Sequence, residues 1–300
     1  MLFCVFSFNR GQFLDNCIDS IERCVPGARI VVFDDDSDDT ATREVLTRIA
    51  QRHRVIQPGH VSQHRLGGLY GNMQTALEQM RDEPLVCYLQ DDTQVVRPLP
   101  EADIAAIHRL FDEDASIGFV HPCFLRGRNR QRDEQSMTYE ERRNIYFRTG
   151  TAQSAGQHFS ALLLMRPERL LARGWEFGRS EPENDRQAAK LFGPMPFMHA
   201  PFAMWLPEVP TYRGKRKTRA LKIAERVSRA GFYPFRILTE AQVRDLKGRP
   251  PEVLPFAEDF LQCLKGDPPK PWGYHPMQNH RWLQNLSNAE VALRHWLQRG

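Results

Sequence analysis

The N-terminal half of the chain alternates short, continuously apolar runs with stretches whose apolar residues recur at helical spacing. The runs of strand type cover residues 2–8, 30–33, 55–56 and 85–89. The stretches of helical spacing lie between them, at residues 13–24, 40–49 and 69–80. A strand that is apolar throughout is covered on both faces, as in a parallel sheet. The alternation therefore predicts a three-layer, Rossmann-like α/β domain with a mostly parallel central sheet.

The second half of the chain is less regular. Its apolar spacing predicts strands over 117–124 and 159–165 and helices over 167–173 and 182–192. From residue 211 the composition becomes strongly basic, and two later stretches predict a helix opened by Thr239 and a final helix that ends at Trp296. We therefore expect a catalytic-type domain over residues 1–210 and a basic segment with an α-helical C-terminal extension over 211–300.

Composition excludes several classes of protein. A chain of 300 residues buries enough apolar surface to need no disulfide or metal for stability. Its six cysteines form no CxxC pair, which predicts reduced core thiols and a cytoplasmic location. The first residues do not resemble a signal peptide, and no apolar run is long enough to cross a membrane, which leaves peripheral contact with its inner face open. A formal net charge of +4 is too small for dedicated nucleic-acid binding.

Acidic residues directly follow two of the predicted strands. Asp34 and Asp35 follow the second strand, and Asp91 and Asp92 follow the fourth. In an open α/β sheet the ligand site lies beyond the carboxyl ends of the strands. Crowded carboxylates at such an edge are commonly relieved by hydrogen bonds or a bound cation, and their hard oxygens suit Mg²⁺ or Mn²⁺. The alternative is a solvated turn that caps the next helix, which we expect for Asp38-Asp39-Thr40.

Taken together, these segments resemble the family 2 glycosyltransferases of GT-A fold. The resemblance rests on Ser7-Phe8-Asn9-Arg10, on Phe33-Asp34-Asp35-Asp36-Ser37 and on Tyr88-Leu89-Gln90-Asp91-Asp92, in that order. Residues 160–166 and Gly174-Trp175-Glu176-Phe177 resemble the family's acceptor-side strand and the turn after it, and Glu183-Asn184-Asp185 stands at its acidic helix start. The resemblance covers about residues 1–205.

The resemblance implies a nucleotide-sugar donor, a divalent metal ion (Mn²⁺ or Mg²⁺), and transfer to a carbohydrate or glycolipid-type acceptor with inversion. It implies Asp92 as the metal ligand, Asp185 as the catalytic base, and Asp35 as a contact to the uracil or ribose of a UDP-linked donor. The other donor-binding residues implied are Ser7, Asn9, Arg10, Asp34 and Asp91. The chain departs from the family pattern at Asp36, which replaces a glycine, after Ser37, where it is one residue short, and at Gln90, which replaces the first acid of the metal motif.

Further residues are candidates for the same site. The basic residues between 212 and 229 suggest a solvated helix face, a lid over the diphosphate, or a patch that binds nucleic acid or an anionic membrane. The lid would use Arg213, Lys215, Arg216 and Lys217. The acceptor or sugar pocket would include Gln157, His158 and Glu183. His199 follows the acidic helix, where some relatives have a metal-ligating histidine, although an ordinary, partly buried histidine is the simpler expectation.

Two other functions are compatible with such a sheet. A sugar-phosphate nucleotidyltransferase would need a Gly-rich phosphate loop after the first strand, and Ser7-Phe8-Asn9-Arg10-Gly11 does not provide one. A protein that only binds a nucleotide or a partner would not need Asp35, Asp92 and Asp185 together. Glycosyl transfer is therefore the function that we expect.

Overall fold

The computed structural model describes the chain except for residues 58–67, 151–155, 212–216, 278–280 and 298–300. Its central sheet has the strand order β3-β2-β1-β4-β8. The strands are β1 (Leu2–Ser7), β2 (Arg29–Asp34), β3 (Arg54–Ile56), β4 (Val86–Gln90) and β8 (Leu163–Met165). The first four run parallel, and β8 pairs with β4 in the antiparallel sense. The predicted mostly parallel sheet is confirmed.

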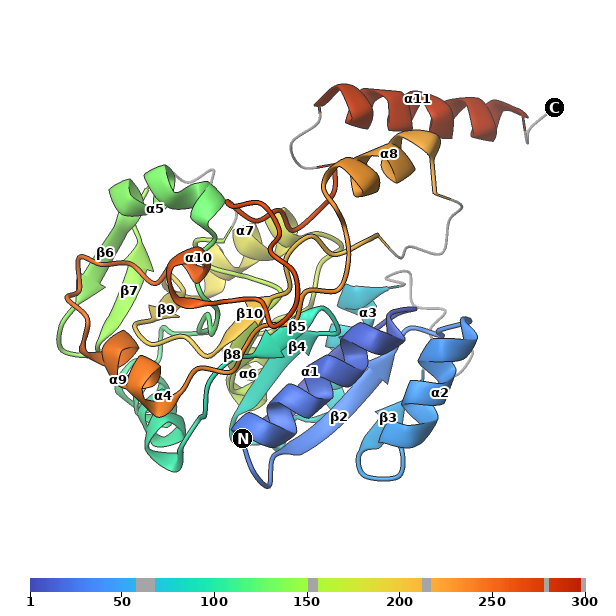
Figure 1. Cartoon of the computed structure of the whole chain (residues 1–300). Coiled ribbons are helices and arrows are strands. Elements are labelled where there is room, and N and C mark those ends of the chain that lie inside the picture. The colour runs from blue at the N-terminus through green and yellow to red at the C-terminus, as the bar shows by residue number, and fades with distance from the viewer. Residues whose placement is uncertain (58–67, 151–155, 212–216, 278–280, 298–300) are drawn as a thin grey trace.

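Helices cover both faces of this sheet (Figure 1). On one face, α1 (Gly11–Cys24) and α2 (Thr40–Ile49) pack over Phe3 and Val5 in one apolar cluster. On the other face, α3 (Leu69–Gln79) packs over Leu2 and Cys4 in a second cluster. These are alternate residues of β1, as expected for a strand that is buried on both sides. The two clusters make the three layers of the predicted domain.

The second half builds two smaller sheets beside the first. In these sheets β5 (Thr93–Val95) pairs with β10 (Ala203–Trp205), and β7 (Ile145–Arg148) lies between β6 (Met137–Glu140) and β9 (Pro196–Met198). The helices of this half are α4 (Glu101–Glu113), the 3-10 turn η1 (Gly127–Asn129), α5 (Arg130–Ser136), α6 (Pro167–Ala172) and α7 (Glu181–Leu191).

The predicted strand over 117–124 forms no regular strand. Val120 and Cys123 make only isolated bridges, with Leu164 and Ala203. Pro122 stands between them and has no N–H to continue a ladder. Its carbonyl accepts from Phe202 N at 2.9 Å instead. The strand predicted over 159–165 is likewise confined to its last three residues, β8.

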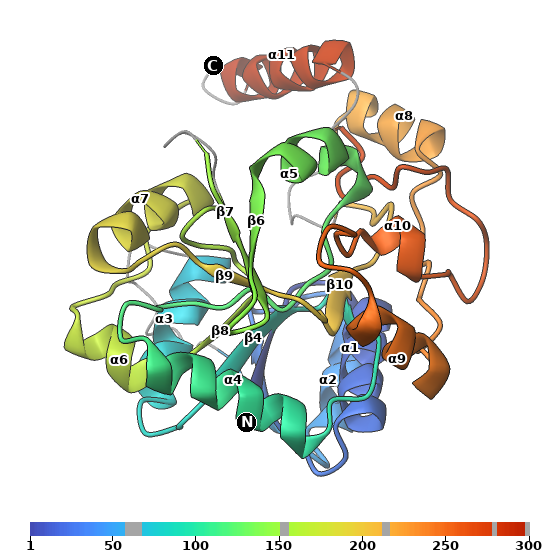
Figure 2. The same ribbon diagram turned by 90° about the vertical axis from the view of Figure 1, so that its left-hand side faces the viewer.

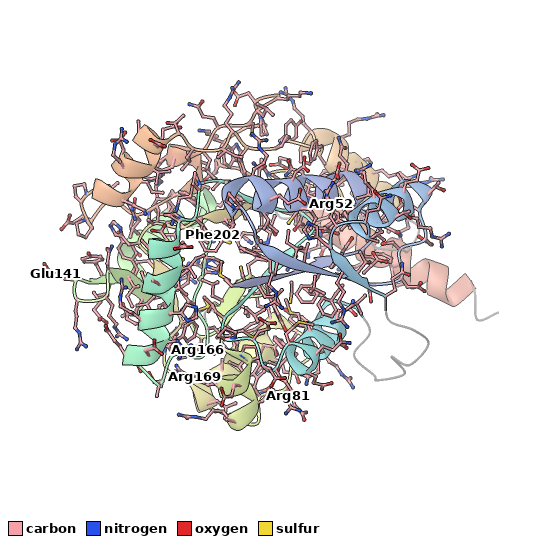
Figure 3. All side chains as sticks on the ribbon, turned by 90° about the horizontal axis from the view of Figure 1, so that it is seen from below. Arg52, Arg81, Glu141, Arg166, Arg169 and Phe202 are labelled. Carbon is pink, nitrogen blue, oxygen red and sulfur yellow. The ribbon has the colours of Figure 1, made fainter. Side chains whose placement is uncertain are left out.

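Two arginines at the start of α6 fix the end of α4. Arg169 donates to the carbonyl oxygens of Phe111, Asp114 and Ile117, and Arg166 donates to the carbonyl oxygen of His108. Figure 3 shows both arginines between the two helices. Cations are favourable at a helix C-terminus, where carbonyl groups lack partners. These contacts attach α4 to the end of β8.

The C-terminal region is helical, as predicted, with α8 (Arg219–Val227), α9 (Glu240–Gly248), α10 (Ala257–Phe260) and α11 (Arg281–Leu297). Thr239 opens α9 with a capping box, which confirms that helix start. The segment between α8 and α10 packs back on the domain, since Phe235 exchanges two hydrogen bonds with Gln94 of β5. By contrast, α8 and α11 pair with each other at one extreme of the molecule (Figures 1 and 2). The division at residue 211 stays a prediction.

All six cysteines are free thiols, and five of them are buried, as the sequence predicted. In the part of the chain that the structure describes, no helix is both long and apolar enough to cross a membrane.

Candidate functional site

The loops after β1 and β2 are joined by Asn9. Its amide oxygen accepts from the backbone N–H groups of Asp38 and Asp39, at 2.9 and 3.2 Å, and its own N–H donates to Ser37 Oγ at 2.9 Å. Asn9 has a positive φ of 50°, a conformation that asparagine tolerates better than most residues. Asp39 accepts from Thr42 N and caps α2, as predicted. The structure therefore places Asn9 as the support of two loops.

The paired acids after β2 differ in what they contact. Asp34 is fully buried and accepts from Ser37 N at 2.8 Å and from Ser37 Oγ at 2.6 Å, so its carboxylate holds the turn. Asp35 is only partly buried and accepts from Asn72 Nδ2 at 3.1 Å. Burial raises the pKa of Asp35 although Asn72 opposes the shift. Of the two acids, Asp35 has the exposed carboxylate that a ligand could reach.

Ser7, at the end of β1, is buried, and its hydroxyl has no hydrogen-bond partner among the described residues. Its carbonyl oxygen accepts from Asp35 N at 2.8 Å. The backbone of Ser7 therefore helps to position Asp35.

Arg10 links the two acids after β4. Its Nη1 lies 3.0 Å from Asp91 Oδ1 and 2.7 Å from Asp92 Oδ2. Asp91 also accepts from Phe8 N at 3.0 Å. Burial raises the pKa of Asp91 to about 6, while Arg10 acts to lower it. Burial acts to lower the pKa of Arg10, but Asp92 and Asp91 outweigh this effect and raise it. The chain thus places one half-buried cation against two carboxylates.

The second oxygen of Asp92 has no such contact. Asp92 Oδ1 is buried and has no hydrogen-bond partner among the described residues. A buried carboxylate oxygen without a donor is costly, unless a ligand satisfies it. This atom is therefore the best candidate in the site for a cation ligand.

A cavity of about 430 Å³ opens beside Asp92, and we call it the Asp92 cavity. Among its lining residues are Gln90, Asp92, Arg126, Trp205, Tyr274 and His275. No sequence pattern indicates His275, which stands alone in a Pro- and Gly-containing segment without a metal-binding spacing. Its Nδ1 accepts from Met277 N at 3.2 Å, which orients the imidazole ring at the wall of the cavity.

A carboxylate and an imidazole in one cavity fit Mn²⁺, which accepts both kinds of ligand. Among the described residues, no group of three His, Cys, Asp or Glu side chains could hold a metal ion by itself. A site with fewer than three protein ligands suits a metal ion whose coordination shell is completed by phosphate oxygens and water. The chemistry of Asp92 and His275 thus fits a metal ion that binds together with a diphosphate.

A second cavity, of about 190 Å³, adjoins the first, and we call it the Glu181 cavity. Arg126 and Trp205 line both cavities. The guanidinium of Arg126 lies 4.1 Å from the centre of the Trp205 ring and 4.7 Å from that of Tyr274, so it is held between two aromatic faces. Arg126 therefore presents a fixed positive charge at the boundary between the cavities.

Glu181 is the first residue of α7 and lines this second cavity. Its side chain is exposed to the cavity. The protein atoms around the carboxyl group still remove part of its hydration and raise its pKa, while the positive charge of Arg126 acts to lower the pKa. A raised pKa and a place in a cavity are typical of a general base. Glu181 was not among the predicted site residues, although it stands four residues before Asp185.

Asp185 holds the loop before β8. Its Oδ1 accepts from the N–H groups of Gly156, His158 and Phe159, at 3.2, 2.8 and 3.0 Å. His158 thus meets Asp185 through its backbone, and Gly156 lines the Glu181 cavity. Asp185 therefore positions one wall of that cavity, and its predicted role as catalytic base stays a prediction.

Other predicted site residues make local contacts. Glu183 is exposed and accepts from Arg179 N at 2.8 Å, which ties the turn before α7. Gln157 is partly buried, and its carbonyl oxygen accepts from Met195 N at 2.9 Å. Lys217 lies 2.7 Å from Glu225 Oε1. The predicted lid residues Arg213, Lys215 and Arg216 lie outside the described residues.

His199 is found away from Asp92. It lines a third cavity with Arg97 and Asp103, and its ring stacks on Tyr146. Burial and the neighbouring Arg249 lower the pKa of His199 to about 4. The structure thus fits the simpler expectation of an ordinary buried histidine.

Solved structures of similar proteins include two glycosyltransferases. The mannosyltransferase PcManGT from Pyrobaculum calidifontis, in complex with GDP-Man and Mn²⁺, is 16% identical, with a TM-score of 0.45 over 97% of this chain and 74% of that chain. Glucosyl-3-phosphoglycerate synthase from Mycobacterium tuberculosis, in complex with Mn²⁺, UDP and glucosyl-3-phosphoglycerate, is 17% identical, with a TM-score of 0.44 over 78% of this chain and 83% of that chain. No curated protein matches the chain.

The family comparison covers more than half of the chain. Residues 3–165 match the family described as Glycosyl transferase family 2, and this range includes the segments 7–10, 33–37 and 88–92 that carry the resemblance. The match selects glycosyl transfer over the nucleotidyltransferase and non-catalytic alternatives. The chain therefore belongs to glycosyl transferase family 2, and it is a glycosyltransferase that takes its sugar from a nucleotide-sugar donor.

Proposed function

We propose that this glycosyltransferase is metal-dependent and moves a sugar from a UDP-linked donor to a hydroxyl group of a carbohydrate or glycolipid acceptor, with inversion. The observation that carries the proposal is the buried, unpartnered Oδ1 of Asp92 beside a cavity that also contains His275. The second cavity, with Glu181 at its wall, adjoins the first and provides a place for an acceptor.

The donor would bind in the Asp92 cavity. Asp92 and His275 would hold Mn²⁺ or Mg²⁺, which when bound supplies positive charge that stabilises the leaving diphosphate. Arg10 neutralises the charge that Asp91 and Asp92 share and keeps Asp92 in place. Arg126 would add a second, fixed cation near the diphosphate.

The nucleoside would be recognised by Asp35. An ionised carboxylate accepts hydrogen bonds but donates none, so Asp35 suits the N3–H of uracil or the hydroxyls of ribose. Cytosine also presents a donor, its 4-amino group, so the choice of uridine rests on the family resemblance and not on this contact.

The acceptor hydroxyl would lie in the Glu181 cavity. As its oxygen forms the new bond to the anomeric carbon, its proton passes to a carboxylate and the bond from that carbon to the phosphate oxygen breaks. The nucleoside diphosphate leaves on the opposite side, so one displacement inverts the configuration. We propose that Glu181 takes the proton and that Asp185, one helical turn later, holds the wall of the cavity; Asp185 as the base is the alternative that the sequence predicts.

We also propose that the basic segment before α8 contributes to binding of the diphosphate, through Arg213, Lys215, Arg216 and Lys217. The many lysine and arginine residues in this segment, which follows the catalytic domain directly, support this role. If it closes over the donor, trypsin should cut the segment more slowly when UDP and Mn²⁺ are present. Equal rates of cleavage with and without them would exclude a closing lid.

Calorimetric titration of UDP in the presence of Mn²⁺ tests the metal assignment. Asp92→Asn keeps the shape of the side chain but replaces an anionic ligand, so metal-dependent affinity should be lost. Asp82→Asn is the matched control, since Asp82 is an exposed acid just before the same strand, at the opposite edge of the sheet. Unchanged affinity in a folded Asp92→Asn protein would remove Asp92 from the metal site.

A further inference from the structure

Exposed apolar side chains gather on the paired helices α8 and α11. Of the large hydrophobic residues that are exposed in the described part of the chain, Ile223, Val227, Trp282, Leu286 and Val291 lie on these two helices. Trp282 and Val227 are 59% and 60% exposed. Only Val253 and Leu264 are found elsewhere in the described residues. Such a gathering marks an interaction surface more often than scattered exposed residues do.

The two helices run antiparallel. At the start of α8, Thr218 Oγ1 lies 2.8 Å from Ser287 Oγ, and Arg219 N donates to Glu290 Oε2 at 2.7 Å. Farther along α8, Ala224 shares an apolar cluster with Leu283, which lies earlier in α11. Figure 1 shows the same opposed directions.

This arrangement places four of the apolar residues on one surface. Ile223 and Val227 are one helical turn apart on α8, and Trp282 and Leu286 are one turn apart on α11. Viewed along each helix from its N-terminus, the exposed pair is rotated in the same sense away from the residues that face the other helix. In antiparallel helices, equivalent sides point in the same direction. We call this surface the outer face of the helix pair.

The outer face is also basic. Arg219, Lys222 and Arg226 follow one another at helical spacing beside Ile223 and are exposed. None of the three side chains forms a salt bridge with a described residue. The acids of the same helices are engaged in other contacts: Glu225 accepts from Thr211 N and Lys217, and Glu290 accepts from Arg219 N. The outer face therefore combines apolar side chains with uncompensated positive charge.

We propose that the outer face binds the surface of an anionic membrane. Basic and apolar side chains on one face of a helix are typical of helices that lie in the membrane interface, where tryptophan is also enriched. Each exposed cation is attracted by anionic headgroups. A second copy of the chain would bring like charges together, which disfavours pairing through this face.

The position of the helix pair gives such binding a consequence for the reaction. Gln284 of α11 lines the Asp92 cavity, so the pair is continuous with the donor site. Figures 1 and 2 place the pair at one extreme of the molecule, where none of the other labelled helices and strands covers it. A membrane at the outer face would hold the site close to lipid-linked acceptors. This consequence rests on the proposed function, whereas the binding itself does not.

Sedimentation with vesicles tests the proposal on the whole chain. The protein should bind vesicles of phosphatidylcholine mixed with phosphatidylglycerol, and binding should weaken as the salt concentration rises. Lys222→Gln with Arg226→Gln should lower the partition coefficient roughly 25-fold, since each cation contributes roughly fivefold. Trp282→Ser with Leu286→Ser should lower it by at least about tenfold.

Matched controls come from exposed residues outside the outer face. Val253→Ser with Leu264→Ser removes two apolar side chains of similar exposure, and Arg81→Gln removes an exposed cation that Figure 3 labels. Both controls should leave vesicle binding unchanged. The proposal is wrong if the protein does not bind, if it binds uncharged vesicles equally well, or if the controls lose as much as the test variants. A dimer that the Trp282→Ser variant alone abolishes would assign the face to a second copy.

The two proposals can fail separately. Vesicle binding needs neither UDP nor Mn²⁺, and sugar transfer to a water-soluble acceptor needs no membrane. Loss of vesicle binding with intact UDP affinity would overturn only the membrane proposal. Loss of UDP affinity in Asp92→Asn is expected to leave vesicle binding intact.

Discussion

Replacing Asp185 tests whether its carboxylate holds the cavity wall or takes the acceptor proton. Its Oδ1 accepts three backbone N–H groups, from Gly156, His158 and Phe159. A hydrogen bond to a charged group contributes about 1.5–3 kcal/mol, and one to a neutral group about 0.5–1.5 kcal/mol. The change Asp185→Asn keeps an acceptor oxygen but loses the charge, so it should cost about 1 kcal/mol per bond, or about 3 kcal/mol of the free energy of unfolding.

Asp185→Ala removes the acceptor altogether and should cost more, about 3–5 kcal/mol, because water reaches only part of this partly buried loop. In a chain of this size, 1 kcal/mol lowers the melting temperature by about 2–4 °C. Asp185→Asn should therefore lower it by about 6–12 °C. A helix-terminal acid without these bonds would give about 1 kcal/mol or less.

Glu181→Gln is the matched comparison. Glu181 lies one helical turn before Asp185 and lines the cavity, so the change should leave the melting temperature almost unmoved. If Glu181 takes the proton, kcat should fall by roughly 10²- to 10⁴-fold while UDP affinity is unchanged. Hydrolysis of a UDP-sugar measures kcat without a known acceptor, since water then takes the place of the hydroxyl.

The two variants separate the roles. A loss of kcat of about 10²-fold or more in Asp185→Asn at an unchanged melting temperature would refute our reasoning and assign the base to Asp185. A melting temperature within about 2 °C of the wild type would show that the three N–H bonds contribute little. Normal turnover in both variants would exclude Glu181 and Asp185 as the base and leave Glu183 of the same helix to be tested.

Two other changes act on the acids of the sheet edge. Asp35→Ala should weaken binding of uridine itself by about 1–3 kcal/mol, because the carboxylate is expected to accept from base or ribose; calorimetry in which uridine affinity is unchanged would exclude this contact. Asp91 has a pKa of about 6 in the folded protein, above its ordinary value of 3.8. Its protonated form therefore stabilises the fold below pH 3.8, and this contribution is lost as the pH rises through 6. Urea unfolding across this range should show a fall in stability that is absent in Asp91→Asn, and equal slopes would contradict the raised pKa.

Local sequence patterns were enough to predict the sheet and one side of the site. The apolar runs of β1, β2 and β4 are nearly continuous, so their strands and the acids after them could be placed without knowledge of the rest of the chain. Patterning could not separate the acids by role. Asp34 and Asp35 are neighbours in sequence, but only the structure shows that Asp34 accepts two hydrogen bonds from Ser37 while Asp35 is partly exposed.

The other side of the site is built by contacts between segments far apart in the sequence. Arg126 is held by Trp205 and Tyr274, and His275 reaches the Asp92 cavity from a segment more than 180 residues later in the chain. None of these residues lies in a periodic stretch or has a ligand-like spacing, so no local pattern indicates them. The same segment also joins the domain to α11.

We therefore expect the variant His275→Ala to weaken UDP binding in the presence of Mn²⁺ but to leave binding of uridine alone unchanged. Asp35, the expected contact to uridine, belongs to the opposite side of the site, which local sequence patterns encode. Calorimetry with both ligands measures this difference, and an equal loss for uridine would show that the two sides of the site are not independent.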